Sequence, residues 1–115
     1  MCNKAIELKK ILKKNNFQIC TFNVLDPLIK NFIIEFSNEL KKRKKLLNSL
    51  EINYIQKWTS KKGLLENLSN LDFKNEFRVG KGIIFHICPN NVPTNFIFSF
   101  FLGLLSGNSN IVKLP

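Results

Sequence analysis

Apolar side chains in the N-terminal part of the chain recur three or four residues apart, which is the period of a helix with one buried face. The pattern predicts helices over 4–14, from Pro27 onward, near 50–58 and near 62–71. Asp26 is the predicted cap of the second helix, whose apolar stripe consists of Ile29, Phe32, Ile33, Phe36 and Leu40. Residues 17–24 form a candidate strand with poor alternation, and residues 72–78 form a polar link.

The pattern changes near residue 80, where a short continuous apolar run replaces the helical spacing. Residues 83–88 are rich in β-branched side chains and lie between Gly82 and Pro89. A run of this kind predicts a strand covered on both faces, as in a parallel sheet. Pro89 ends the strand because proline has no N–H for the ladder.

The next segment, 95–106, is apolar nearly all round and predicts a helix that is buried on most of its sides. Pro93 suits its first turn, Thr94 is a candidate cap, and Gly107 is the predicted terminator. Gly103 within the helix costs about 1 kcal/mol relative to alanine. It therefore predicts a close approach by another backbone.

Residues 109–114 predict a second strand, so that the C-terminal part forms a right-handed βαβ unit. The expected fold class is α/β, with a mainly helical segment at 1–78 and the start of a dinucleotide-binding domain at 79–115. Two parallel strands cannot bury themselves, so we expect this domain to be incomplete, as in a truncated protein. The chain is then expected to aggregate or to pack loosely unless a missing C-terminal part or a partner chain completes it.

The helix at 95–106 is too short to cross a membrane, because its apolar core is roughly a dozen residues against the roughly 20 that a span requires. The N-terminal residues MCNKAIELKK contain no apolar signal core, so we expect a cytoplasmic chain. Three cysteines without paired spacing and a single histidine give no recognisable zinc site or disulfide framework. No metal is expected.

The run GIIFHICPNNVPTNFIFSFFLGLLSGNSNIVKLP, together with its contiguous parts HICPNNVPTNF and GLLSGNSNIVKLP, is similar to a known family. It resembles the N-terminal cofactor-domain segment of the acyl-CoA reductases, the fatty-acid-reductase component of bacterial bioluminescence systems. That family belongs to the aldehyde dehydrogenase superfamily. The resemblance covers residues 80–115 and is loose over the helical N-terminal part. It implies an aldehyde-dehydrogenase-like cofactor domain.

The resemblance also implies roles for residues around the first crossover. The family's Pro-x-Asn-x-Pro pattern falls on residues 89–93, which makes Asn91 the side-chain amide donor to the substrate oxyanion. Lys113 matches a lysine that hydrogen-bonds the adenosine ribose, and Gly107 with Asn108 matches a structural turn. The nicotinamide end of the cofactor is expected beside Ile87, Cys88, Pro89 and Asn90. Asn90 departs from the superfamily pattern, which usually has a tryptophan-like residue at this position of the loop.

The implied reaction is the NADPH-dependent reduction of a fatty acyl thioester, either acyl-CoA or acyl-protein, to an aldehyde. In the family the nucleophilic cysteine lies far downstream, in a catalytic domain. None of Cys2, Cys20 and Cys88 occupies its place. The chain alone is therefore expected to be inactive.

Each of these residues also has a purely structural interpretation. Asn91 suits a turn, Lys113 suits a strand end in solvent, His86 suits a core histidine, and Cys88 suits a small buried apolar position. The phenylalanine-rich helix is interpreted as core packing, and Tyr54 and Trp58 are expected on the buried face of a helix.

The net charge is +10, and all eight acidic residues lie before Val79. The basic excess belongs to the N-terminal part and is densest over 41–45, in the predicted last turns of the second helix, where cations complement the helix dipole. Three interpretations of this block stay open: a solvated helix end, contact with nucleic acid or an anionic membrane, and attraction of coenzyme A. The alternative function is therefore a non-enzymatic basic helical module, although no nucleic-acid-binding signature is present.

Overall fold

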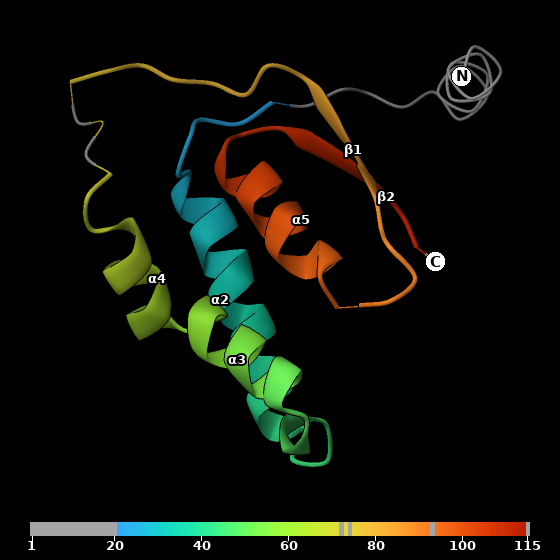
Figure 1. Cartoon of the computed structure of the whole chain (residues 1–115). Coiled ribbons are helices and arrows are strands. Elements are labelled where there is room, and N and C mark those ends of the chain that lie inside the picture. Colours follow the sequence, from blue (N-terminus) through green and yellow to red (C-terminus); the bar gives the residue numbers. More distant parts are fainter. Residues whose placement is uncertain (1–20, 72, 74, 93, 115) are drawn as a thin grey trace, which may run out of the picture.

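The computed structural model describes residues 21–71, 73, 75–92 and 94–114, and it places the elements close to their predicted positions. The helix predicted over 4–14 and the first turn predicted at Pro93 lie outside these residues. Figure 1 shows the elements, which are α2 (Pro27–Lys42), the 3₁₀ turn η1 (Leu46–Asn48), α3 (Leu50–Thr59), α4 (Lys61–Leu68), β1 (Ile83–Ile87), α5 (Phe96–Leu105) and β2 (Ser109–Lys113).

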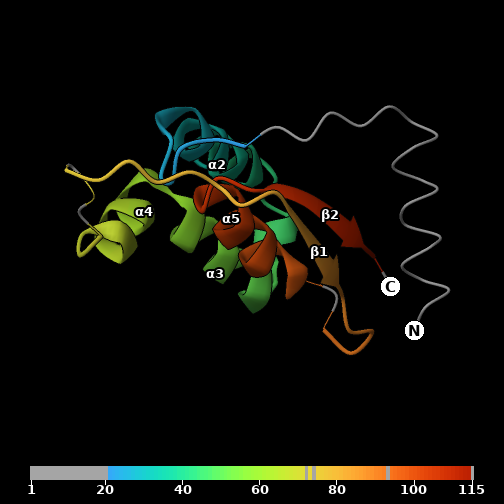
Figure 2. The same ribbon diagram turned by 90° about the horizontal axis from the view of Figure 1, so that it is seen from above.

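The two strands pair in parallel, with Ile83 opposite Ser109 and Ile87 opposite Lys113. Helix α5 connects them and packs on one face of the pair (Figure 2). The predicted βαβ unit is therefore confirmed, and the described part of the chain is a mixed helix-and-sheet structure.

The opposite face of the sheet is open, which corrects the expectation of a strand covered on both faces. Phe85 is 43% exposed and Ile87 is 68% exposed, and both lie on the face turned away from α5. Alternate residues of a strand point to opposite faces, so one covering helix buries only every second side chain. The continuous apolar run correctly predicted a parallel strand, although a second covering layer is not seen among the described elements.

One hydrophobic core joins the helices to the βαβ unit. Its buried members come from α2, α4 and α5, and they are Ile29, Ile33, Leu64, Phe101 and Leu105. The ring of Phe36 meets Phe101 edge to face, with 5.0 Å between centroids, and seats α5 against α2. Close-packed apolar contacts of this kind are the main stabilising term in a fold of this size.

Helix α5 is covered on most of its sides, as its composition predicts. Phe101, Gly103 and Leu105 are buried, whereas Leu102 is 53% exposed. Ser99 is also exposed, so one side of the helix faces solvent. On the side of α3, Phe98 contacts the rings of Tyr54 and Trp58. Trp58 is half-buried as expected, but Tyr54 is largely exposed.

Helix α2 begins where the sequence predicts, because the Asp26 carboxylate accepts a hydrogen bond of 2.8 Å from the Leu28 N–H. It ends at Lys42, so only Lys41 and Lys42 lie in its last turn. Arg43 is the C-cap, and Lys44 and Lys45 lie in the turn that follows. The prediction that the whole basic block belongs to the last turns of the helix is therefore correct only for Lys41 and Lys42. Lys42 pairs with Glu39 at 2.6 Å.

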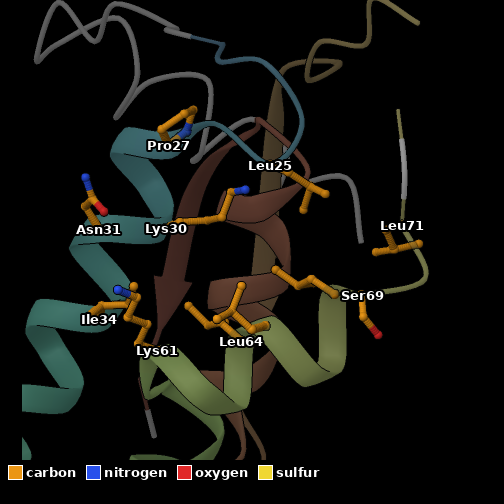
Figure 3. Close-up of a pocket in the computed structure, with 11 residues that line it drawn as sticks. Leu25, Pro27, Lys30, Asn31, Ile34, Lys61, Leu64, Ser69 and Leu71 are labelled. Carbon is orange, nitrogen blue, oxygen red and sulfur yellow. The ribbon is translucent and has the colours of Figure 1, made fainter. Parts of the chain in front are cut away.

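Helix α4 ends at Leu68, three residues earlier than predicted, and packs Leu64 into the core. Between α2 and α4 lies a pocket that Leu64 also lines (Figure 3). The Ser69 hydroxyl donates to the Glu66 carbonyl at 3.0 Å and so satisfies a carbonyl of the last turn. Side-chain bonds of this kind compete with continuation of a helix.

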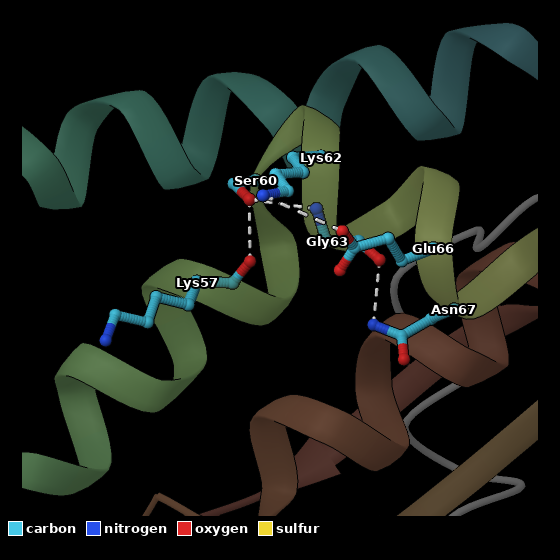
Figure 4. A network of polar contacts seen from close by, with 6 residues as sticks. All are labelled: Lys57, Ser60, Lys62, Gly63, Glu66 and Asn67. Atoms are coloured by element: carbon cyan, nitrogen blue, oxygen red, sulfur yellow. Dashed lines mark hydrogen bonds and ion pairs between the residues drawn. The ribbon is translucent and has the colours of Figure 1, made fainter.

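The corner between α3 and α4 is fixed by Ser60 (Figure 4). Its hydroxyl accepts a hydrogen bond of 3.1 Å from the Gly63 N–H and donates one of 2.6 Å to the Lys57 carbonyl. One residue therefore satisfies a donor at the start of α4 and an acceptor at the end of α3. Farther along α4, the Asn67 amide donates to the Gly63 carbonyl at 2.8 Å.

Gly107 ends α5 as predicted. Its φ is +80°, its N–H donates to the Leu104 carbonyl at 2.9 Å, and the Asn108 N–H donates to the Gly103 carbonyl at 3.2 Å. These two bonds form a Schellman motif, which requires a left-handed residue at this point and so favours glycine.

Two local predictions are wrong. Within the candidate strand at 17–24, the described residues 21–24 contribute only an isolated antiparallel bridge between Asn23 and Val79. Thr94 does not cap α5, because its hydroxyl donates to the Glu51 carboxylate at 2.8 Å instead. For Thr94, a tertiary partner has replaced the local one.

None of the described helices combines the length and apolar character needed to cross a bilayer.

Candidate functional site

The carboxyl ends of the two parallel strands bring three of the predicted site residues together. Ile87 and Lys113 are direct register partners, and the Cys88 N–H donates to the Lys113 carbonyl at 3.3 Å. In open α/β sheets, ligands bind in the crevice outside the carboxyl ends of the strands. Ile87, Cys88 and Lys113 are therefore gathered where such a fold places its ligand, and we call them, with residues 89–91, the carboxyl edge.

The loop that leaves β1 carries the other predicted residues. Pro89, Asn90 and Asn91 are all exposed, and they connect the end of β1 to α5 (Figure 1). Within the described part of the chain, the Asn91 side chain makes no hydrogen bond. Its exposed amide is thus available as a donor to a ligand.

Cys88 is 8% exposed and forms no disulfide. A nucleophilic thiol needs exposure and an electropositive neighbourhood that stabilises the thiolate. The burial of Cys88 instead supports its interpretation as a small apolar residue that packs beneath the start of the loop.

A polar pair, His86 and Asn110, links the two strands on the face covered by α5. The sequence drew attention to His86 but not to Asn110. The His86 Nε2 lies 2.7 Å from the Asn110 Oδ1. The Asn110 amide nitrogen donates to the Asn108 carbonyl at 2.8 Å, which leaves Oδ1 as the acceptor. His86 is therefore protonated at Nε2 and has the structural role expected of a core histidine.

Gly103 explains how this pair fits beneath the helix. A Cβ at Gly103 would overlap the Asn110 Oδ1. The group that approaches Gly103 closely is therefore the Asn110 side chain. This corrects the prediction that another backbone would approach the helix there. The signal in the sequence was an asparagine beside the apolar residues of the second strand, together with an unexplained glycine in the preceding helix.

Asn108 ties the other end of the sheet to the end of α5. Its Oδ1 accepts from the N–H groups of Lys81 and Gly82, at 2.7 and 3.1 Å, and its amide nitrogen donates to the Ser106 hydroxyl at 3.0 Å. The structural role predicted for Gly107 and Asn108 is thereby confirmed.

The charged side chain of the carboxyl edge is the Lys113 ammonium, and no acidic residue follows Glu76 in the sequence. In the last turns of α2, the hydrogen bond and charge of Lys42 lower the pKa of Glu39, and Glu39 raises the pKa of Lys42. Among the described residues, no group of His, Cys, Asp and Glu side chains is arranged to hold a metal ion. The edge offers an amide, an ammonium group and apolar surface, which suit an anionic or carbonyl-bearing ligand.

Comparison with known proteins gives one result. A protein-family model described as acyl-CoA reductase (LuxC) matches residues 3–115. No match was found among curated proteins or among solved structures. The matched region includes both the helical part and the βαβ unit with its carboxyl edge.

Proposed function

Because the chain belongs to the acyl-CoA reductase (LuxC) family, we propose that it provides part of the cofactor site of an NADPH-dependent fatty acyl thioester reductase. The βαβ unit is then the first crossover of an aldehyde-dehydrogenase-like cofactor domain. The family match extends over the basic helical part as well, which favours the reductase over a separate nucleic-acid-binding or membrane-binding module.

The observation that carries this proposal is the juxtaposition at the carboxyl edge. Parallel pairing places Ile87 beside Lys113, and the loop with Asn91 leaves the sheet at the same end. Had the strands been antiparallel, their carboxyl ends would lie at opposite edges of the sheet, and the predicted residues would not form one site.

The residues present fit a dinucleotide. NADPH supplies the hydride when it is bound, and the protein supplies orientation and electrostatics. In this proposal the Lys113 ammonium donates a hydrogen bond to a ribose hydroxyl of the cofactor. The exposed Ile87 contributes apolar surface beside the reacting ring, and the run from Cys88 to Asn90 continues the wall of the site.

Asn91 has a different task in the proposed mechanism. Its side-chain amide donates to the substrate carbonyl oxygen as negative charge develops on that atom. A preorganised donor of this kind is worth about 3–4 kcal/mol of transition-state stabilisation. The absence of a competing hydrogen bond to Asn91 in the described part of the chain leaves the amide free for that role.

We propose that the nucleophile is not one of the cysteines of this chain. Cys88 is buried, and Cys2 and Cys20 lie outside the described residues.

In the proposed reaction a thiolate from another part of the enzyme attacks the acyl carbonyl and coenzyme A leaves as its thiolate. NADPH, when bound, would supply the hydride to the carbonyl carbon of this enzyme-bound thioester, and the C–S bond would break to give the aldehyde and return the enzyme thiolate. The 115-residue chain is expected to bind ligand without turning it over.

The test is NADPH binding by the purified chain and by two matched lysine variants. Lys113→Met removes a cation at the carboxyl edge, whereas Lys81→Met removes one at the other end of β1 and keeps the same net charge. Loss of one charge-assisted hydrogen bond is expected to weaken binding by about tenfold in Lys113→Met. The affinity of Lys81→Met should match that of the unmodified chain.

Two results would count against the proposal. If NADPH did not bind the unmodified chain, the proposed cofactor role of the chain would be wrong. Equal weakening in both variants would show that NADPH responds to total charge and not to the carboxyl edge.

A further inference from the structure

A pocket of about 320 Å³ lies between α2 and α4 (Figure 3). Figures 1 and 2 place α4 on the side of the molecule away from the loop that follows β1, so this pocket is separate from the carboxyl edge. Most of its lining is aliphatic, contributed by Leu25, Ile34, Leu64, Leu65, Leu68 and Leu71. We call it the α2–α4 pocket.

The α2–α4 pocket has a firm floor and an open side. Leu64 is buried and belongs to the core, so it fixes the floor. Leu65 is 65% exposed on the same helix, and Leu71 beyond the helix is also exposed. Ser60 sets the start of α4 at the corner with α3, and this geometry holds the leucines of α4 opposite α2. The open side therefore leaves apolar surface in contact with water.

The polar part of the lining is basic. Lys30 enters from α2 and Lys61 from the first turn of α4, and Figure 3 shows both beside the aliphatic residues. Neither lysine forms an ion pair within the described part of the chain, and no lining residue is acidic. The neighbouring Lys62 differs, because it pairs with Glu66 at 3.9 Å. An apolar trough lined by two lysines complements a ligand that has an apolar tail and an anionic head.

We propose that the α2–α4 pocket binds a single-chain fatty carboxylate, with its tail on the leucines and its carboxylate between Lys30 and Lys61. The volume lies at the lower end of the roughly 300–1,000 Å³ typical of ligand pockets, which suits one chain and is too small for a two-chain lipid. A carboxylate has no thiol leaving group, so this ligand is not the substrate of thioester reduction. The proposal does not rest on the reductase assignment.

The experiment is a calorimetric titration of the purified chain with dodecanoate below its micelle-forming concentration. We expect saturable binding of one molecule per chain. Lys30→Gln with Lys61→Gln should weaken binding by about five- to tenfold, because two partly exposed ion pairs are lost. Lys44→Gln with Lys45→Gln makes the same charge change beyond α2 and should leave the affinity unchanged. Dodecanol, which has the same tail and no charge, should bind more weakly than dodecanoate.

A second pair of variants separates the pocket from other apolar surface. Leu65→Glu places an anion in the α2–α4 pocket and should abolish measurable binding. Phe85→Glu makes the same change on the open face of the sheet and should not affect binding. Both side chains are substantially exposed, so neither change is expected to unfold the chain.

Non-saturable uptake would overturn the proposal, and so would dodecanol binding as tight as dodecanoate. Equal weakening in the two lysine pairs, or in the two glutamate variants, would overturn it as well. Saturable dodecanoate binding in a chain that does not bind NADPH would uphold this site and reject only the proposed cofactor role.

Discussion

The position of the Asn110 side chain depends on Gly103, and the hydrogen bond of His86 depends on Asn110. Asn110 occupies the space that a side chain at Gly103 would need, and from there it reaches both His86 and the Asn108 carbonyl. A buried hydrogen-bonding group that loses its partner is costly, so the small size of Gly103 protects the polar link between β1 and β2.

Gly103→Ala is therefore expected to destabilise the chain. Overpacking costs about 1–3 kcal/mol, whereas the gain in helix propensity is about 1 kcal/mol, so the expected net loss is about 1 kcal/mol. In an Asn110→Ala background the overlap is absent, and the same change should become neutral or stabilising. Chemical denaturation of the four members of this double-mutant cycle measures the coupling. Equal destabilisation in both backgrounds would contradict the overlap.

The elements with local signals could be predicted from the sequence, and those that depend on tertiary partners could not. Asp26 before Pro27 located α2, Gly107 located the end of α5, and the apolar run at 83–88 located β1. Thr94 has the side chain of a cap, but it bonds to Glu51 from another helix. The open face of the sheet was also missed, because an apolar strand pattern does not reveal which face is covered.

The same distinction applies to the candidate site. Parallel pairing follows from the strand-helix-strand pattern, so the location of Ile87 and Lys113 at the same end of the sheet could be predicted. The pairing of His86 with Asn110 could not, because it depends on the register of two strands and on the absence of a side chain at Gly103. Likewise, the α2–α4 pocket depends on the corner at Ser60 and gives no signal in the local pattern.

The two serines that precede α3 and α4 provide a matched test at the level of the elements. Ser60 caps α4 through its hydroxyl, whereas Ser49 stands at the N-cap of α3 without a side-chain hydrogen bond. Ser60→Ala should lower the free energy of unfolding by about 1 kcal/mol, a typical value for a lost cap. Ser49→Ala should change it much less. Denaturant titrations of both variants provide the measurement, and equal losses would refute the specific role of Ser60.

At the scale of the whole molecule, the helices and the βαβ unit share one core but leave one face of a two-stranded sheet in solvent. Exposed apolar surface and unpaired strand edges favour association with other chains. The expectation that the isolated chain self-associates or packs loosely therefore stays a prediction.

The carboxyl edge and the α2–α4 pocket lie on different sides of this core and make different demands on a ligand. The edge presents the Asn91 amide and the Lys113 ammonium outside the ends of parallel strands. The pocket presents aliphatic side chains beneath two lysines. Separate sites of this kind can be tested independently, because no residue belongs to both.

The most direct test of the central claim is a titration of the isotope-labelled chain with NADPH, followed through the backbone amide resonances. The account predicts that the largest shifts occur at Cys88, Asn90, Asn91 and Lys113, with little change at the basic residues 41–45. Shifts confined to the basic residues, or the absence of saturable shifts at the carboxyl edge, would contradict it.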